Sequence, residues 1–348
     1  MFTIFYIFLI FIIIISLLYN IPKTEHFLSK TVELTDLTLN PFIYQTTTPF
    51  SKEIFNVLSR HIPIIIKNTN RDTVELISDN SCNIIYQFLK TKKTKYRYIT
   101  ALFPKYLTIL THIDNNILTF DEMINNQSIH NIYILDYKNP EIIKKILTIL
   151  LNTDRFNYIY IDKLPKKIEK NAYYSLLSSE YNIDIYNLSK SNNFFIIELP
   201  ERHPNYLELI IEFPHLSMSK YDISFQRGFN KNKIIFSIRD FFCLWSFDYV
   251  PDYKVYTLIK TIFENLENIR TGFTSEMDKY IIQYLRPENM IKITIIPNHN
   301  GVDQYYRELE IYSHNSNQLC INTISSIRCQ PDTLFENRFK LLNLYGTQ

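Results

Sequence analysis

The chain has 348 residues, of which 46% are hydrophobic and 21% are charged, so it can bury one large core or two medium ones, and a disordered chain is excluded. The 37 lysine and arginine residues nearly balance the 35 aspartate and glutamate residues, and a net charge of +2 argues against nucleic acid as a partner. The 4 glycines are isolated from one another, which excludes a glycine-rich loop that binds nucleotide phosphates.

The chain begins with an uncharged, apolar segment from Phe2 to Leu18, close to the about 20 residues that cross a bilayer. It lacks the basic start and the small-residue cleavage pattern of a secretory signal peptide, so we expect an uncleaved transmembrane anchor over residues 1–22. The lipid bilayer is then a partner and the protein a single-pass membrane protein. Two lysines and two glutamates follow soon after the segment, so the side of the membrane stays open.

The four cysteines do not decide the compartment. Cys82 and Cys243 lie in apolar runs, which is typical of free buried thiols. Cys320 and Cys329 could form a disulfide in a C-terminal hairpin if the domain faces an oxidising space, but two unbridged thiols are the favoured alternative.

Beyond the anchor, hydrophobic periodicity and turn residues predict alternating strands and helices. We expect strands at residues 37–44, 62–66, 83–87, 98–103, 107–112, 131–136, 158–161, 194–199 and 234–238. We expect helices at residues 51–60, from residue 72 onward, and at 141–151, 171–181 and 252–270. This alternation favours an α/β fold with a parallel or mixed sheet and helices on its faces.

No arrangement of residues in the sequence is typical of a catalytic or metal site. The eight histidines are scattered, and the metal-binding and nucleophile patterns H-E-x-x-H, C-x-x-C and G-x-S-x-G are absent. We therefore expect no enzyme activity, no metal and no cofactor. The aromatic run at residues 241–245 is read as core, with a ligand pocket as the less favoured alternative.

Four stretches of the chain are similar, in order and spacing, to segments of one protein family: residues 99–110, 117–123, 251–266 and 296–308. The last stretch reads IPNHNGVDQYYRE and is similar to a receptor motif of the form P-x-H-P-G-A-x-x-Y-Y-R-E. From about Leu37 to Glu308, the chain resembles the TAXI-family solute receptors of tripartite ATP-independent (TRAP) transporters.

This resemblance implies a two-lobed, type II periplasmic-binding-protein-like fold behind the anchor. Lobe 1 would contain residues 32–111 and 226–310, lobe 2 would contain residues 112–225, and residues 311–348 would form a C-terminal extension. The strand at residues 107–112 and the region around residues 221–225 would cross between the lobes, which can then hinge around a cleft.

The resemblance also implies a receptor that binds a small, anionic molecule between the lobes and has a membrane protein partner. Two turns that are rich in glycine or serine in the family read QTTTP and YKNP here, so side chains would replace close backbone contacts to an anion. The ligand-binding candidates are Thr46, Thr47, Thr48, Gln87, Lys138 and Asn139. The alternative is a degenerate receptor fold reused as a structural or protein-interaction module.

The C-terminal motif is expected to have a structural role, with His299 as a ligand contact in the alternative reading. Arg307 is expected to pair with a carboxylate, and Gly301 to adopt a positive φ that other residues resist. Tyr305 and Glu308 complete the part of the motif that would close the first lobe.

Overall fold

The structure is a computed structural model that describes residues 42–45, 56, 58–60, 62–67, 74–135, 139–179, 182–190, 193–224, 230, 232–271, 283–291 and 295–308. The expected anchor, the Cys320–Cys329 pair and the C-terminal extension lie outside these residues. Among the described helices, none has both the length and the apolar composition that crossing a membrane requires.

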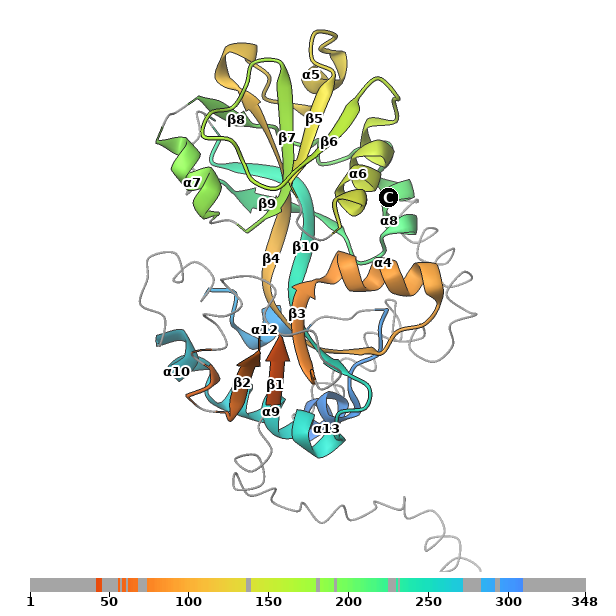
Figure 1. Cartoon of the computed structure of the whole chain (residues 1–348), viewed down its shortest axis with the longest axis vertical. Helices are drawn as coiled ribbons and strands as arrows, with labels where there is room; N and C mark the ends of the chain where they lie inside the picture. Colours follow the sequence, from red (N-terminus) through yellow and green to blue (C-terminus); the bar gives the residue numbers. More distant parts are fainter. Residues whose placement is uncertain are drawn as a thin grey trace, which may run out of the picture. The chain divides into compact units, whose positions relative to one another are not determined.

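The described strands form one hydrogen-bonded sheet (Figure 1). They are β1 (Phe42–Gln45), β2 (Ile64–Lys67), β3 (Leu76–Asn80), β4 (Tyr96–His112), β5 (Asn131–Leu135), β6 (Asn157–Ile161), β7 (Ala172–Ser178), β8 (Phe194–Ile196), β9 (Ser217–Asp222) and β10 (Ile234–Phe247). Their order is β2-β1-β3-β10-β4-β7-β5-β6, with β8 beside β4 and β9 beside β10. Parallel pairs at both ends of the sheet and antiparallel pairs in its middle confirm the expected α/β fold with a mixed sheet.

Helices connect many of these strands. They are α4 (Ser81–Thr91), α5 (Phe120–Asn125), α6 (Pro140–Leu151), α7 (Ile183–Ser189), α8 (Tyr206–Glu212), α9 (Asp252–Glu264), α10 (Leu266–Thr271), α12 (Pro287–Met290) and α13 (Asn300–Glu308), with a 3-10 turn at Ile113–Asn115. The predicted helix at residues 141–151 is confirmed as α6. The predicted helix at residues 252–270 is two helices, α9 and α10, separated at Asn265.

The two long strands β4 and β10 lie side by side and belong to both halves of the sheet (Figure 1). One end of β10 pairs with β9 and the other end with β3, while β4 pairs with β7 and β8 beyond its contact with β10. The predicted crossing at residues 107–112 is the second half of β4. β9 ends at Asp222, in the region predicted for the return crossing, and β10 is the strand that continues into the other half. The proposed lobe boundaries themselves stay a prediction.

The buried hydrophobic residues fall into separate clusters along this sheet. One cluster contains Ile77, Ile85 and Trp245, from β3, α4 and the end of β10. Two others draw mainly on residues between 106 and 238, including Tyr173 of β7, and the larger of these also contains Cys82 from the start of α4. The first turns of helix α4 therefore contribute residues to two of the hydrophobic clusters. Cys82 and Cys243 are buried and form no disulfide within the described residues, as predicted.

The prediction of a helix at residues 171–181 is wrong, because β7 (Ala172–Ser178) occupies most of this segment. Every residue of β7 is buried, and the strand lies between β4 and β5. A strand covered on both faces shows no alternation of polar and apolar residues, so its sequence cannot be told from that of a buried helix by period alone.

Helix and strand are exchanged relative to the prediction in the segment before β4. The expected helix from residue 72 is the strand β3, and the expected strand at residues 83–87 lies within helix α4. Ile84, Ile85, Phe88 and Leu89 repeat with the spacing of one helical face, and they pack in the cluster with Trp245. The predicted strand ends at residue 87, whereas the helical period becomes visible only when Phe88 and Leu89 are included.

Pro104 lies inside β4, where the sequence predicts a break between two strands. At this position β4 pairs with Phe241 of β10 on one side and with no described strand on the other. A proline removes a backbone donor, and it is tolerated in a strand where that donor has no neighbouring strand to bind. The two predicted strands are therefore one continuous strand.

The C-terminal motif is structural in the described residues, although for a different reason than expected. Gly301 has no positive φ. Instead, a Cβ atom at Gly301 would lie 2.2 Å from the Asp252 carbonyl oxygen and 2.6 Å from the Tyr256 amide nitrogen, so α13 approaches α9 backbone to backbone. His299 Nε2 lies 2.9 Å from the Val250 carbonyl oxygen, which joins the segments that directly precede these two helices. Arg307 is exposed, and within the described ranges no ion pair joins it to a carboxylate.

We predict that Gly301→Ala destabilises the protein at or above the upper end of the about 1–3 kcal/mol that overpacking usually costs, because the new methyl group meets backbone atoms that cannot rotate away. The matched control is Arg307→Ala on the exposed face of the same helix, which should change the stability by less than about 0.5 kcal/mol. Thermal unfolding followed by circular dichroism measures both. Equal melting temperatures for Gly301→Ala and the wild type would show that the two helices can separate without cost.

Candidate functional site

The turn from β3 into α4 places a buried polar cluster at the centre of the sheet. All five residues of β3 are buried, and the strand ends in Asp79 and Asn80. Asp79 Oδ1 accepts hydrogen bonds from the Asn80 amide at 2.7 Å and from Asn83 Nδ2 at 2.9 Å. One carboxylate thus fixes the turn and the first residues of α4, which is how a short polar side chain usually orders the entry into a helix.

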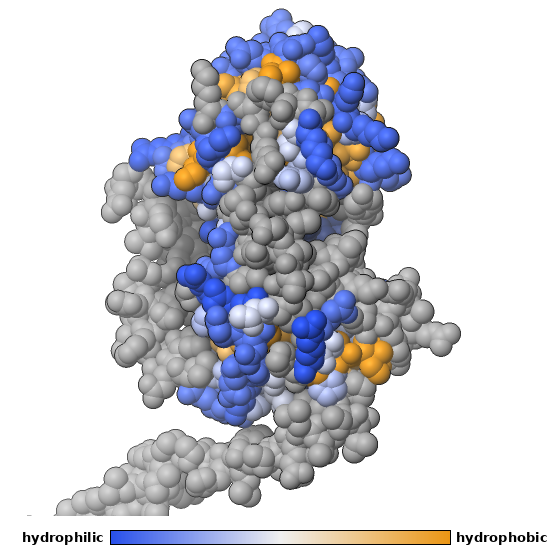
Figure 2. Space-filling model, turned by 90° about the vertical axis from the view of Figure 1, so that its left-hand side faces the viewer, coloured by the Kyte–Doolittle hydropathy of each residue, from blue (hydrophilic) through white to orange (hydrophobic). Residues whose placement is uncertain are grey.

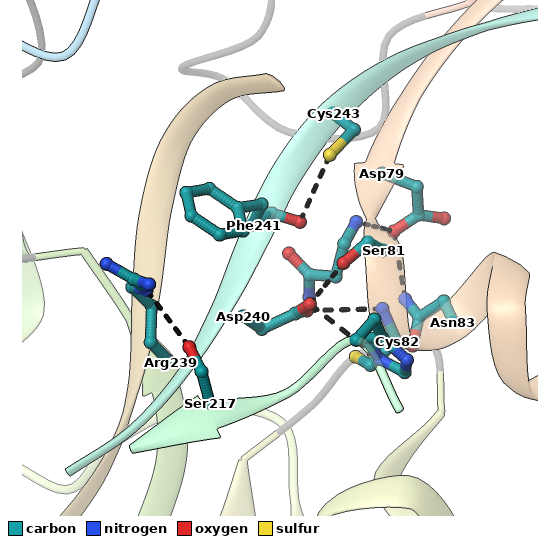
Figure 3. Close-up of polar contacts among 11 residues, drawn as sticks. Asp79, Ser81, Cys82, Asn83, Ser217, Arg239, Asp240, Phe241 and Cys243 are labelled. Atoms are coloured by element: carbon teal, nitrogen blue, oxygen red, sulfur yellow. Dashed lines mark hydrogen bonds and ion pairs between the residues drawn. The ribbon is translucent and has the colours of Figure 1, made fainter. Parts of the chain in front are cut away.

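A second carboxylate reaches this turn from β10. Phe242 pairs with Asn80, so Asp240, two residues away on the same strand, lies just past the end of β3 where α4 begins. The Ser81 hydroxyl donates a hydrogen bond to Asp240 Oδ1, and the Cys82 amide donates to Asp240 Oδ2 at 3.2 Å (Figure 3). Asp240 is completely buried. The N–H groups and the positive dipole end of α4 stabilise its negative charge.

His215, from the loop between α8 and β9, faces the same carboxylate. Its Nε2 lies 3.9 Å from Asp240 Oδ1, and its side chain is 5% exposed. Burial lowers the pKa of His215 to about 4, although the negative charge of Asp240 acts in the opposite direction. The imidazole is therefore neutral at pH 7. Neither ring nitrogen has a hydrogen-bond partner within the described part of the chain, and the same holds for Asn80 Oδ1.

Two cationic side chains lie at strand positions near the cluster. Lys105 of β4 is the strand partner of Asp240, and its ammonium group lies 5.0 Å from the centre of the Phe242 ring. Arg239 packs over Phe241 at 5.1 Å and donates from Nε to Ser217 Oγ at 3.3 Å (Figure 3). Because neighbouring residues of a strand point to opposite faces, Lys105 shares the face of Asp240 and Arg239 lies on the other face.

A second set of contacts holds α4 against α6 and α8. The rings of Tyr86 and Phe213 stack with their centres 5.7 Å apart. The Lys145 ammonium group lies 5.3 Å from the centre of the Tyr86 ring and forms an ion pair with Glu212. Because Phe213 is two residues from His215, this stack also fixes the loop that presents the imidazole.

The predicted ligand-binding residues are not tested by these contacts. Gln87 is exposed in the middle of α4, and its backbone carbonyl oxygen accepts a hydrogen bond from the Thr91 hydroxyl. Asn139 is half-buried at the N-terminal cap of α6 and makes no side-chain capping bond. Thr46, Thr47, Thr48 and Lys138 lie outside the described residues. The six candidates remain a prediction.

Sequence reasoning did not select the residues of the buried cluster, Asp79, Ser81, His215 and Asp240. One signal was present: Asp240 is a charged residue within a long apolar strand, and such a residue is usually paired or hydrogen-bonded. Its partner Ser81 lies 159 positions away, so the pairing itself had no local signature.

The surface of the described residues is mainly hydrophilic on the face drawn in Figure 2, with smaller hydrophobic patches among the polar side chains. The large hydrophobic side chains that are exposed are Ile65, Tyr160, Leu207, Ile211, Ile234, Tyr249 and Tyr253. They lie on different elements, and Leu207 and Ile211 are the two that share a helix. Scattered exposed residues of this kind are normal for a folded protein.

No protein-family model and no curated protein sequence matches the chain. Among solved structures, similarity is found to a TctC solute-binding protein from Polaromonas, with 12% identity over 80% of this chain and 98% of that chain and a TM-score of 0.39. MatC from Rhodopseudomonas palustris with bound malate has 10% identity, coverage of 78% and 98%, and a TM-score of 0.40.

The binding protein component of an ABC phosphonate transporter from Pseudomonas aeruginosa has 9% identity, coverage of 88% and 96%, and a TM-score of 0.37. A likeness at this level assigns neither a family nor a ligand. The function is therefore inferred from the residues of the chain itself.

We predict that His215 makes stability fall on the acid side of neutrality. Its pKa is about 4 in the folded protein and about 6.5 when unfolded, so between these values the unfolded chain binds a proton that the folded protein does not. This imidazole should cost roughly 3 kcal/mol of stability between pH 7 and pH 4. His215→Gln, which cannot gain the proton, should show a correspondingly flatter pH dependence in urea unfolding. Parallel curves for variant and wild type would contradict the assignment.

Proposed function

We propose that the chain is a solute-binding protein of the periplasmic-binding-protein type, which binds a small molecule between two lobes and catalyses no reaction. The observation that carries the proposal is the buried polar cluster at the junction of β3, α4 and β10. Buried polar atoms are nearly always hydrogen-bonded, so the unpartnered atoms of His215 and Asn80 point to a group or water that completes the cluster. The similarity of residues 296–308 to the receptor motif supports the same reading.

The arrangement of the strands supports two lobes. β4 and β10 are the strands that pair with elements of both halves, and the hydrophobic clusters divide on either side of this pair. We propose that residues 32–111 and 226–310 form one lobe and residues 112–225 the other. β4 and β10 would form the hinge, since a small twist of these two strands moves one lobe relative to the other without breaking either hydrophobic core.

We propose an anionic group on the solute. In the sequence, Lys138 directly precedes Asn139, the N-cap of α6, a helix of 12 residues whose N-terminal end favours negative charge. The hydroxyl groups of Thr46, Thr47 and Thr48 would donate hydrogen bonds to the same group. Gln87 and Asn139 complete the proposed set.

Thermal shift measurements on the full-length chain test solute binding, with small carboxylates and amino acids as the probes. A probe present at 100 times its dissociation constant should add about 2.7 kcal/mol of stability. Replacing Lys138 and Asn139 together by alanine should abolish the shift without lowering the melting temperature of the free protein. The control is Lys163→Ala, which removes an exposed lysine from a different loop and should leave the shift unchanged.

A second candidate function is a receptor fold reused as a structural or protein-interaction module. The observation in its favour is that Asp240 already occupies the N-terminal end of α4 with a carboxylate from the same chain. If no carboxylate and no amino acid changes the melting temperature, this second function replaces the first.

We further propose that the segment from Phe2 to Leu18 anchors the protein in a membrane, where it meets a membrane protein partner. A tether raises the effective concentration of the domain at any partner in the same bilayer. We predict that the full-length protein stays in the membrane fraction after high-salt and carbonate washing, since an apolar helix is not released by either. Recovery in the soluble fraction, with an N-terminus near Ile21, would identify a cleaved signal peptide instead.

A further inference from the structure

The N-terminal end of helix α4 can bind an anion, and no side chain of α4 itself provides one. The N-terminal end of a helix exposes up to four N–H groups without partners and carries the positive end of the dipole. α4 has 11 residues, its N-cap Asn80 makes no side-chain capping bond, and its first turn contains no acidic residue. Asp79 accepts the Asn80 amide just before the helix, but α4 has neither a capping bond from its N-cap side chain nor an acidic first-turn residue, and a carboxylate is a group that such an end binds well.

The group that fills this position comes from β10. Asp240 accepts the Ser81 hydroxyl at one oxygen and the Cys82 amide at the other, and so occupies the end of the helix with both oxygens (Figure 3). It is fully buried and lies 159 positions from Ser81 along the chain. Nothing in the local sequence of α4 requires this arrangement, which has the donor set of an anion-binding site.

His215 gives independent support for a ligand-like site. Its side chain is 95% buried, both ring nitrogens lack a hydrogen-bond partner, and Nε2 lies 3.9 Å from Asp240 Oδ1. An imidazole N–H at this distance is too far for a hydrogen bond to Asp240, yet it faces the carboxylate. The His215 imidazole is thus a potential hydrogen-bond donor beside Asp240 that the Asp240 carboxylate does not use.

We propose that the N-terminal end of α4 is a carboxylate-binding site and that Asp240 of the same chain is its resident ligand. The donors would be the Ser81 hydroxyl and the Cys82 amide, with the His215 imidazole available to a carboxylate that sits closer to the ring than Asp240 does. Removal of the Asp240 side chain should then convert the position into a site for a free carboxylate of similar size, of which formate is the smallest.

The test is the melting temperature of full-length Asp240→Ala at pH 7 in formate and in chloride at equal ionic strength. Trp245, the single tryptophan of the chain, is fully buried beside Tyr98, so its fluorescence reports unfolding. Without formate the variant should melt well below the wild type, because buried donors lose their acceptor. Formate should raise its melting temperature in a saturable manner, whereas the wild type should respond to formate and chloride alike.

Three further variants separate a site from a general salt effect. Ser81→Ala combined with Asp240→Ala removes one donor and should weaken the response to formate. Asp240→Asn fills the position with a neutral amide and should not respond. The matched control is Asp222→Ala, because Asp222 also accepts one amide and one serine hydroxyl, both from Ser224, but it lies at the end of β9 before a 3-10 turn and not at the start of an α-helix. It should respond to formate no more than the wild type does.

Each outcome decides for or against the proposal. If Asp240→Ala folds only in formate, recovery of the native near-ultraviolet circular dichroism on refolding from urea supports the site. If it melts identically in formate and chloride, or stays unfolded in both while Asp240→Asn folds, the site is not a carboxylate site. The outcome for Asp240→Ala can be told apart from the test of solute binding, which measures the response of the wild type and of the Lys138 and Asn139 double variant to carboxylates and amino acids.

Discussion

The antiparallel pairing of β4 with β10 is the interaction on which the rest of the structure depends. β3 pairs with one end of β10 and β9 with the other, while β7 and β8 pair with β4. The pairing of β10 with β3 fixes the geometry of the buried cluster. Because Phe242 is opposite Asn80, and because side chains two residues apart share one face of a strand, the register alone puts Asp240 at the start of α4. A slip of one residue would turn Asp240 to the other face of the sheet and separate it from α4.

The parts of the fold that the sequence predicts well are those with one solvent-facing side. α6 and α9 have an apolar stripe and a polar face; the prediction matches α6 within one residue and the start of α9, but it joins α9 and α10 into one helix. The errors fall where this contrast disappears. β7 is buried throughout, and β3 is buried throughout, so neither has the two-residue period that identifies a strand. Their identity comes from the strands on either side, which no local window contains.

The candidate site was less predictable than the fold, and for a related reason. The turn and helix-start residues Asn80 and Ser81 carry a local signal for a cap, but Asp240, the partner of Ser81, is on a strand 159 positions later in the chain. The resemblance to receptors predicts ligand-binding residues in the turns after two strands, at Thr46 to Thr48 and at Lys138 and Asn139. The charge in the middle of β10 needed knowledge of the register before it could be connected to α4.

The position of β10 late in the chain has a consequence for synthesis. As the chain leaves the ribosome, β3 appears with one edge that stays unpaired until residues 242–246 have been made. During that interval β3, which is fully buried in the folded protein, and the start of α4 have no native neighbour on that side, and unpaired edges of this kind promote association with other chains. Contacts this distant in sequence also slow folding, because a large loop must close before the pairing is rewarded. A nascent chain of this protein would therefore depend on chaperones while the residues between β4 and β10 are being made. Truncation before residue 242 would leave β3 without its partner β10.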